Sequence, residues 1–227
     1  MLHPPISKLL LLNKPVNWTS FDVVKKVRGI IKNCYSISKI KVGHSGTLDP
    51  KASGLLLICV GNKTKEISML TDLKKKYIAI VKLGFITDSF DSETPEKDSK
   101  EYSHLSEVVV EETILSFMGR QDQTPPIFSA IKVNGERLYK KARRGDVEIS
   151  IEARTIQIYN MRIINIDLPF VKFEVECSKG TYIRSLANDI GKKLETGAYL
   201  YSLKRTQIGD FKLQNAINIQ DIEKHIL

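Results

Sequence analysis

Cysteine and histidine are scarce in this 227-residue sequence, and neither residue type is clustered. Cys34, Cys59 and Cys177 lie far apart and form no CxxC pair, and the four histidines are equally scattered. This spacing excludes the usual signatures of a disulfide scaffold and of a zinc site. We therefore interpret the cysteines as small apolar residues of the core.

Long apolar runs and the common nucleotide and hydrolase motifs are also missing. No segment approaches the roughly 20 continuous apolar residues of a membrane-spanning helix, and the aliphatic run at 9–12 is too short for a signal peptide. The GxGxxG, P-loop, HExxH and GxSxG motifs do not occur. We expect a cytoplasmic protein with no membrane partner, which uses side chains alone, with no metal and no cofactor.

The chain carries a formal net charge of +9, and its charges are unevenly distributed. Residues 88–112 contain nine acidic and only two basic side chains, so the rest of the chain is more basic than this total suggests. A basic body suits a polyanionic ligand such as nucleic acid. A solvated basic surface without such a ligand is the alternative that charge alone leaves open.

The apolar pattern predicts a mixture of helices and strands. Strands are expected at 9–13, 55–60, 76–83, 156–166, 171–177 and 199–205. Helices are expected after a Thr19 or Ser20 cap and at 62–72, 107–118, 181–194 and 219–226, with Thr181 as a further cap. Loops are expected at 41–54 and 87–106, and a hairpin formed by 127–133 is expected to turn at Asn134 and Gly135.

These elements show no βαβ rhythm. We therefore expect an α+β fold with a mixed, largely antiparallel central sheet and flanking helices. The whole chain, 1–227, is expected to form one domain with an insertion near 87–120.

Two segments concentrate basic side chains. The first helix is expected to turn one face inward and to carry Lys25, Lys26, Arg28 and Lys32 on the other. Its expected inward positions are Phe21, Val24, Val27, Ile30 and Ile31. The second basic segment is 132–144, which follows the expected hairpin at once.

Asp49, in the sequence GHSGTLDP, is the best local candidate for a reactive side chain. Glycines at 43, 46 and 54 permit tight turns and the close approach of a ligand. Pro50 keeps Asp49 out of helical backbone angles, so its carboxylate can point in a fixed direction beside the aliphatic strand. The alternative is that Asp49 and Pro50 form only a turn.

Three further residues are candidates for a functional site. Tyr77 follows three lysines, and such a ring can stack on an unpaired base while the lysines meet phosphates. Arg184 lies in the first turn of a helix, where the macrodipole disfavours a cation, so an acidic partner is expected, with Asp49 as one candidate. His44 can position RNA or a water molecule. A core tyrosine, a surface arginine and a structural histidine are the alternatives.

Taken together, these segments resemble the TruB-type tRNA pseudouridine synthases. Five blocks in the family's order carry the resemblance: LLNKP at 11–15 with Thr19 and Ser20, GHSGTLDPKASGLLLICVGNKTK at 43–65, KKYIAIVKLGFITDSFD at 75–91, QTPPIFSAIK at 123–132 and CSKGTYIRSLANDIG at 177–191. One LDP motif would be a weak signal, whereas ordered blocks over most of the chain are specific.

The resemblance implies a pseudouridine synthase catalytic fold that converts the T-loop uridine of tRNA (position 55) to pseudouridine without a cofactor. In this family pattern Asp49 is the catalytic carboxylate, Tyr77 lies against the target base and Arg184 pairs with the carboxylate. Asp49 can act by covalent attack or by assisting deprotonation at the sugar. The uridine must be flipped out of its stack to reach it. Further substrate contacts fall on His44, Tyr182 and Leu203.

The expected partner is the T-arm stem-loop of tRNA, bound by a monomer through phosphate neutralisation. The side chains expected to contact the RNA backbone are Lys25, Lys26, Lys132, Lys140, Lys141, Arg143 and Arg144. Many relatives continue into a PUA-like RNA-binding module, but too few residues follow Arg205 for one, so none is expected here. Two alternatives remain: a non-catalytic RNA chaperone or binding protein on this scaffold, and a pseudouridine synthase for another RNA site.

Overall fold

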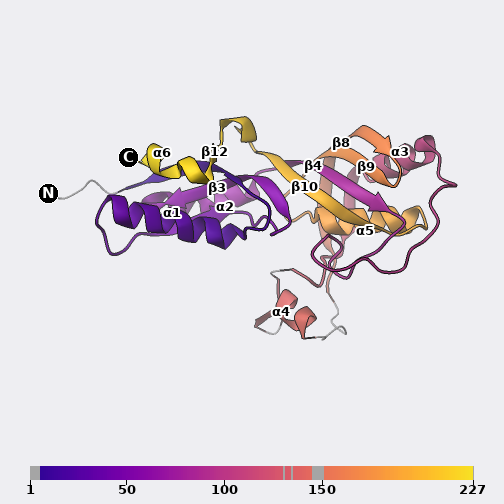
Figure 1. The fold of residues 1–227 in the computed structure, drawn as a ribbon, viewed down its shortest axis with the longest axis horizontal. Coiled ribbons are helices and arrows are strands. Elements are labelled where there is room, and N and C mark those ends of the chain that lie inside the picture. The colour runs from indigo at the N-terminus through magenta and orange to yellow at the C-terminus, as the bar shows by residue number, and fades with distance from the viewer. Residues whose placement is uncertain (1–5, 130, 134, 145–150, 227) are drawn as a thin grey trace. The chain divides into compact units, whose positions relative to one another are not determined.

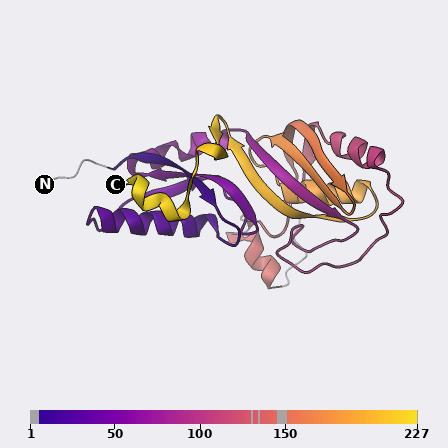
Figure 2. The same ribbon diagram turned by 45° about the horizontal axis from the view of Figure 1, so that its top comes forward.

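The computed structural model describes residues 6–129, 131–133, 135–144 and 151–226 (Figures 1 and 2). The chain divides into two compact units, one formed by Met1–Ile78 with Leu203–Leu227 and the other by Ala79–Ser202. Strands β4 (Lys75–Leu83) and β10 (Ala198–Ile208) contribute residues to both units. This division therefore does not decide whether 1–227 is one catalytic domain, which stays a prediction.

The first unit is built around β3 (Ala52–Val60), whose continuous apolar run makes it a buried central strand. The strand order is β12-β1-β3-β10. Strand β1 (Lys8–Lys14) and the short β2 (Val42–Ser45) both pair antiparallel with β3. The part of β10 that belongs to this unit pairs parallel with the beginning of β3, at Leu203 to Arg205.

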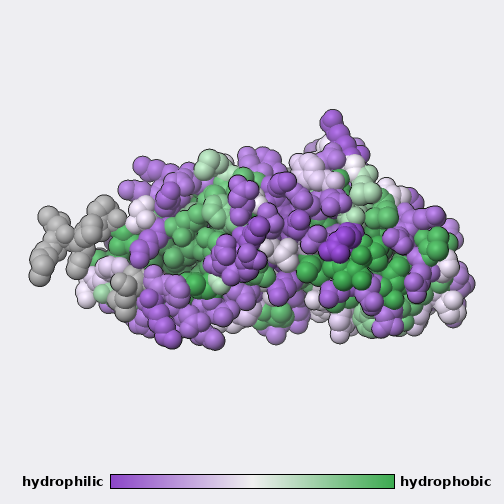
Figure 3. Space-filling view, turned by 90° about the horizontal axis from the view of Figure 1, so that it is seen from above, coloured by the Kyte–Doolittle hydropathy of each residue, from purple (hydrophilic) through white to green (hydrophobic). Residues whose placement is uncertain are grey.

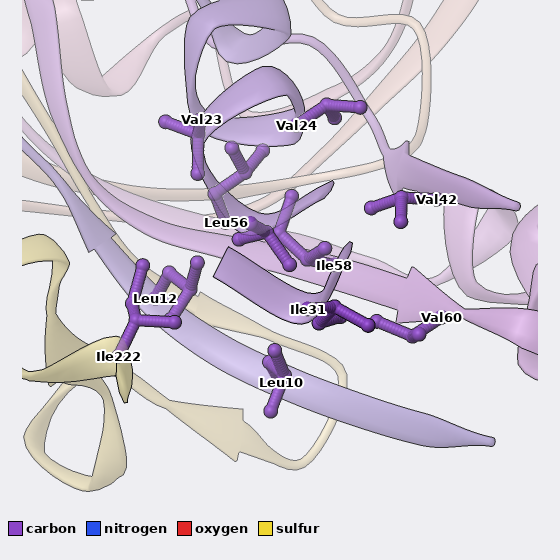
Figure 4. Packing of buried hydrophobic residues seen from close by; sticks show 11 residues of the cluster. Leu10, Leu12, Val23, Val24, Ile31, Val42, Leu56, Ile58, Val60 and Ile222 are labelled. Carbon is purple, nitrogen blue, oxygen red and sulfur yellow. The ribbon is translucent and has the colours of Figure 1, made fainter. Parts of the chain in front are cut away.

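Helix α1 (Ser20–Cys34) packs on one face of this sheet and forms a core with it (Figure 4). The helix begins as its sequence predicts, because the Thr19 side chain accepts from the Asp22 amide while the Asp22 carboxylate accepts from the Thr19 amide. The core comprises Val23, Val24, Val27 and Ile31 of the helix with Leu10, Leu12, Val42, Leu56, Ile58, Val60 and Ile222.

The opposite face of β3 is covered as well. Leu55, Leu57 and Cys59 pack there with Leu70 of α2 (Ile67–Asp72) and with Ile208 of β10. The remaining elements of the unit are η1 (Gly61–Glu66), β11 (Phe211–Lys212), η2 (Leu213–Asn215), β12 (Ile217–Asn218), η3 (Ile219–Asp221) and α6 (Ile222–Ile226).

In the second unit the strand order is β10-β4-β9-β8-β5. The antiparallel pair β8 (Arg154–Asp167) and β9 (Phe170–Cys177) is followed by β5 (Gly119–Gln123), which pairs antiparallel with β8. Helix α5 (Ile183–Lys193) and α3 (Glu107–Leu115) supply most of the helical apolar core. The remaining elements are β6 (Lys132–Val133), β7 (Glu136–Arg137) and α4 (Leu138–Arg143).

The predicted α+β fold with a mixed, largely antiparallel sheet is confirmed, but four local predictions are wrong. The expected loop 41–54 contains β2 and the start of β3, because pairing with β3 imposes strand geometry on a sequence without apolar alternation. Phe21 is 53% exposed, with Lys25 over its ring, whereas Val23 turns inward. The hairpin expected at 127–133 forms between β6 and β7, but the expected length of its first strand is wrong, because β6 covers only Lys132–Val133. Thr181 donates to the Ser178 carbonyl, and Tyr182 is the N-cap of α5.

The acidic stretch was expected to be a surface loop, and it is only partly so. It has no helix or strand between β4 and α3, as predicted, yet Thr87, Ser89 and Asp91 are buried. The first residues of the segment are therefore partly buried in the second unit, although Asp88 is already exposed, and all of the residues 95–101 are exposed.

Candidate active site

Asp49 lies on the loop between β2 and β3, and contacts within the first unit hold this loop on both sides of it. The Ser20 hydroxyl accepts from the Leu48 amide (2.8 Å) and donates to the Leu48 carbonyl (3.0 Å). The Asn17 amide donates to the Pro50 carbonyl (2.7 Å). The Asp49 side chain is half-buried, and the backbone is fixed by hydrogen bonds on both sides of it.

Arg205 of β10 binds the same loop and is almost fully buried, at 1% exposure. Its guanidinium donates to the carbonyls of Leu55 (2.8 Å), Gly46 (3.1 Å) and Thr47 (3.4 Å). These carbonyls lie on both sides of Asp49 in the sequence. Sequence reasoning missed Arg205 as a site residue, because a cation near the end of an apolar strand ordinarily points to solvent.

Lys14 is a second buried cation in this unit. Its ammonium donates to the carbonyls of Pro15 (2.9 Å) and Trp18 (2.6 Å). Burial lowers the pKa of Lys14 from 10.5 to about 8, and the negative charge of Asp49 opposes this shift. Asp49 therefore acts electrostatically on a lysine whose charge changes just above neutral pH. In the sequence, Lys14 stood in a family block without a role of its own.

His44 is half-buried on β2, and within the described residues its Nδ1 has no hydrogen-bond partner. Burial lowers the pKa of His44, and the positive charge of Arg205 adds to this effect. Both effects favour the uncharged form of the ring. Its role as a substrate contact stays a prediction.

Tyr77 and Leu203 are the predicted apolar walls of the site. Tyr77 lies on β4 at 8% exposure, and Leu203 lies on β10 at 7% exposure. Leu203 is paired in register with Ala52, so it is close to the loop that carries Asp49. Contact with a base stays a prediction for both residues.

Arg184 lies in the first turn of α5, in the second unit, and is 3% exposed. Its Nε is 3.7 Å from an Asp91 carboxylate oxygen, and its Nη1 donates to the carbonyls of Ser89 (3.2 Å) and Phe128 (3.0 Å). The acidic partner that a cation at a helix N-terminus requires is thus supplied within this unit. Pairing of Arg184 with Asp49 stays a prediction, since the two residues belong to different units.

Asp91 was missed because it stands in a segment that looked like a solvated acidic loop. Its side chain accepts from the Ser89 hydroxyl (2.6 Å) and from the Glu93 amide (2.9 Å). These bonds fix the carboxylate that faces Arg184. Composition does not distinguish one buried acidic residue from its exposed neighbours, and the only sign of a role for Asp91 in the sequence was its place in the family block 75–91.

Tyr182 is held at the start of α5 by Gln123 of β5. The Gln123 amide accepts from the Tyr182 amide (2.8 Å) and donates to the Tyr182 carbonyl (3.0 Å). The Tyr182 ring lies 5.1 Å from the Arg154 guanidinium and 6.0 Å from that of Arg184. The Tyr182 ring and the Arg184 guanidinium therefore lie close together at the start of α5.

The solvent face of α1 carries the first predicted RNA surface. Lys25 and Lys26 are both exposed. They border a hollow of about 460 Å³, which is also lined by Trp18, Asp22, Gly29, Ile30 and Asn33. Hydrophilic side chains cover much of the face seen in Figure 3, with apolar areas between them.

The second predicted RNA surface is only partly described. Lys140 is exposed on α4 and Lys141 is half-buried. Arg144 donates to both carboxylate oxygens of Glu136 (2.6 and 2.8 Å). The side chains of Lys132 and Arg143 lie outside the described part of the structure.

In the part of the chain that the structure describes, no three His, Cys, Asp or Glu side chains are grouped so that they could hold a metal ion. The helices within that part are also too short or too polar to cross a bilayer.

Solved structures and curated proteins resemble this chain over nearly its whole length. A chain of a Cbf5–Nop10–Gar1 complex matches 95% of it with a TM-score of 0.72 and 29% identity. A chain of an archaeal box H/ACA sRNP Nop10–Cbf5 complex matches 99% with a TM-score of 0.69 and 26% identity. This chain spans about half the length of those two chains, 53% and 55%. This chain therefore shares its fold with part of each of those two chains.

The sequence relatives are closer. A Chlorobium chlorochromatii protein called tRNA pseudouridine synthase B is 49% identical over 98% of this chain and 87% of its own length. A protein of the same name from Flavobacterium johnsoniae is 46% identical over 96% of each chain.

Two family models match successive parts of the chain. The TruB family pseudouridylate synthase N-terminal domain matches residues 32–183, and the tRNA pseudouridylate synthase B C-terminal domain matches residues 184–227. The chain therefore belongs to the TruB family of pseudouridylate synthases, which are isomerases. The predicted resemblance and the predicted fold are both confirmed.

Proposed function

We propose that this enzyme converts the T-loop uridine of tRNA to pseudouridine, with Asp49 as its catalytic carboxylate. The observation that carries the proposal is the fixed loop around Asp49, in a chain 49% identical to a protein called tRNA pseudouridine synthase B. A carboxylate whose flanking residues are immobilised can meet the reacting sugar and base without reorganising first. A tRNA substrate would place the enzyme in the cytoplasm.

In this reaction the N-glycosidic bond to N1 breaks, the uracil turns and C5 bonds to the sugar. The proton leaves C5 for solvent and N1 gains one, so no electron is gained or lost. Asp49 serves either by attack on the flipped uridine or by assisting deprotonation at its sugar. Leu203, which is paired beside the loop, would supply an apolar wall for the base, and Tyr77 would lie against it.

In the second unit, Arg184 and Tyr182 would approach the target nucleotide from the start of α5. Arg184 is already held by Asp91, Ser89 and Phe128, so its guanidinium is oriented before RNA binds. Pairing of Arg184 with the Asp49 carboxylate, which the family pattern implies, is part of this proposal. The basic surfaces on α1 and at 132–144 would neutralise phosphates of the T arm.

The test uses a T-arm stem-loop labelled with tritium at uridine C5. We expect the wild-type protein to release one label per T-loop uridine and Asp49→Asn to release none. Both should bind the RNA with similar affinity. Release by Asp49→Asn at the wild-type rate would remove Asp49 from the chemistry.

The same assay separates the alternatives. Salt-sensitive RNA binding without release by the wild type would favour an RNA chaperone or binding protein. Release from tRNA whose T-loop uridine is replaced by cytidine would indicate another RNA site.

A further inference from the structure

Arg205 is unusual because it is a buried cation whose bonds, among the described residues, go to carbonyl oxygens and not to a carboxylate. Burying an arginine is costly unless its charge and its donors are satisfied. Three carbonyl groups aimed at one guanidinium meet part of that demand through their dipoles. Such an arrangement fixes the positions of those carbonyls as firmly as it fixes the arginine.

We infer that Arg205 is a positioning residue that sets the conformation of the Asp49 loop. It binds Gly46 and Thr47 just before Asp49, and Leu55 at the beginning of the buried part of β3. The Arg205 side chain therefore links the residues before Asp49 to those after it, and Asp49 lies on the segment between these bonds. This inference rests on the proposed catalytic role of Asp49.

The backbone of Arg205 is placed by the same strand pairing. Arg205 is in register with Gly54, and a side chain at Gly54 would come within 2.3 Å of the Arg205 carbonyl oxygen. The close approach that glycine allows brings β10 against the loop. Leu203 stands two residues before Arg205 and faces the same side of β10. One strand segment therefore carries both the arginine that binds the Asp49 loop and the predicted wall of the base site.

Lysine cannot replace this arginine. A guanidinium presents a rigid fork of donors, whereas an ammonium is a compact charge on a flexible stem. The three carbonyls are bound by three different nitrogens, Nε, Nη1 and Nη2. Arg205→Lys keeps the charge but leaves most of these carbonyls without their donor, so the loop loses its fixed geometry.

The electrostatic surroundings agree with this placement. The positive charge of Arg205 contributes to lowering the pKa of His44 and the pKa of Lys14, whereas the negative charge of Asp49 raises the pKa of Lys14. The charge of Arg205 therefore acts on both His44 and Lys14. Arg205→Gln should raise the pKa of His44, which an NMR titration of its ring would measure.

The test compares Arg205→Lys with Ile208→Ala in a single-turnover assay at saturating labelled stem-loop. Ile208 is buried in the same strand, so its truncation loosens the same unit without touching the loop. We expect Arg205→Lys to lower the rate about 100-fold, because displacement of a reacting group by about 1 Å has that effect. RNA affinity should change less than about twofold, since β10 carries none of the phosphate contacts proposed. Ile208→Ala should keep the wild-type rate while it is folded.

A wild-type rate in Arg205→Lys would overturn the inference, as would losses of rate in both variants that follow their unfolded fractions. If Arg205→Lys does not fold, Arg205→Gln replaces it with the same expectations. If neither folds, Arg205 serves the whole unit and the inference is overturned. Asp49→Asn is assayed alongside: release by that variant would refute the proposed function whatever Arg205 does.

Discussion

The Arg184 guanidinium and the Asp91 carboxylate form a buried ion pair in the second unit, with Nε and Oδ2 3.7 Å apart and 4% of each side chain exposed. A pair of this kind is costly to break, because removal of one partner leaves a buried charge uncompensated. Asp91→Asn should therefore lower the free energy of unfolding by about 3 kcal/mol. Urea unfolding followed by circular dichroism would measure it.

Asp88→Asn is the matched control for this experiment. Asp88 stands in the same acidic segment, but its salt bridge to Lys97 is exposed. Exposed ion pairs contribute only about 0–1 kcal/mol. Equal losses in the two variants would mean that burial of the Arg184–Asp91 pair does not matter to stability.

Two glycines of the first unit should respond in opposite directions to alanine. Gly54 has a positive φ of 106°, and an added Cβ would lie 2.3 Å from the Arg205 carbonyl oxygen. Gly54→Ala should destabilise the protein by at least about 2 kcal/mol, because both the backbone angle and the packing oppose it. Thermal unfolding would show this as a lower Tm.

Gly29 lies in the middle of α1, is exposed, and has no atom within 4 Å of an added Cβ. Gly29→Ala should raise stability by roughly 0.5–1 kcal/mol, since alanine loses less backbone entropy in a helix. A destabilised Gly29→Ala would show that α1 is not a simple helix at this position. A Gly54→Ala variant as stable as the wild type would contradict the close approach of β10.

Much of the fold follows from the sequence because its elements have strong local signals. The helix after Thr19 has a capping box, and β4 alternates buried and partly exposed residues along its length. Strand β2 gave no such signal. Its sequence, VGHS, becomes a strand only because β3 offers a pairing edge, and tertiary pairing of this kind is invisible to periodicity.

The site was predicted unevenly for the same reason. Asp49, Tyr77 and Arg184 were named through family blocks, and Tyr182 with Arg184 shares a motif that keeps them together. Asp91 and Arg205 were not named as site residues, because each owes its role to a partner far away in the sequence. Charged residues are ordinarily exposed, so burial of these two is decided by tertiary contacts alone.

Lys14 should give stability a pH dependence above pH 8. Its pKa is about 8 in the folded protein, because it is buried, against 10.5 ordinarily. Between these values the unfolded chain holds a proton that the folded protein lacks, so the free energy of unfolding rises with pH. Below pH 8 both states are protonated and this contribution to the slope vanishes. The rise should reach about 3 kcal/mol over the whole window.

Lys14→Met should remove this rise, and the difference between it and the wild type isolates Lys14 from other titrating groups. Lys65→Met, which alters an exposed lysine of η1, should keep the wild-type slope. Urea unfolding at several values between pH 7.5 and 10 would supply the comparison. Parallel curves for Lys14→Met and the wild type would exclude a depressed lysine pKa.

RNA binding should depend on salt through the exposed lysines of α1. Each phosphate contact that a lysine neutralises contributes about 0.7–0.9 to the slope of log affinity against log salt. Lys25→Gln and Lys26→Gln should each reduce that slope by about this amount, while the single-turnover rate at saturating RNA stays unchanged. Filter binding of the T-arm stem-loop between about 50 and 200 mM KCl covers the useful range.

Lys224→Gln is the control, since Lys224 is also exposed but lies on α6, next to Asp221, outside both proposed RNA surfaces. Its slope should equal that of the wild type. If Lys25→Gln and Lys26→Gln also left the slope unchanged, the RNA would not cross α1. A fall in the single-turnover rate at saturation would instead connect this helix to the chemistry, because pure phosphate contacts act on affinity and not on the bound complex.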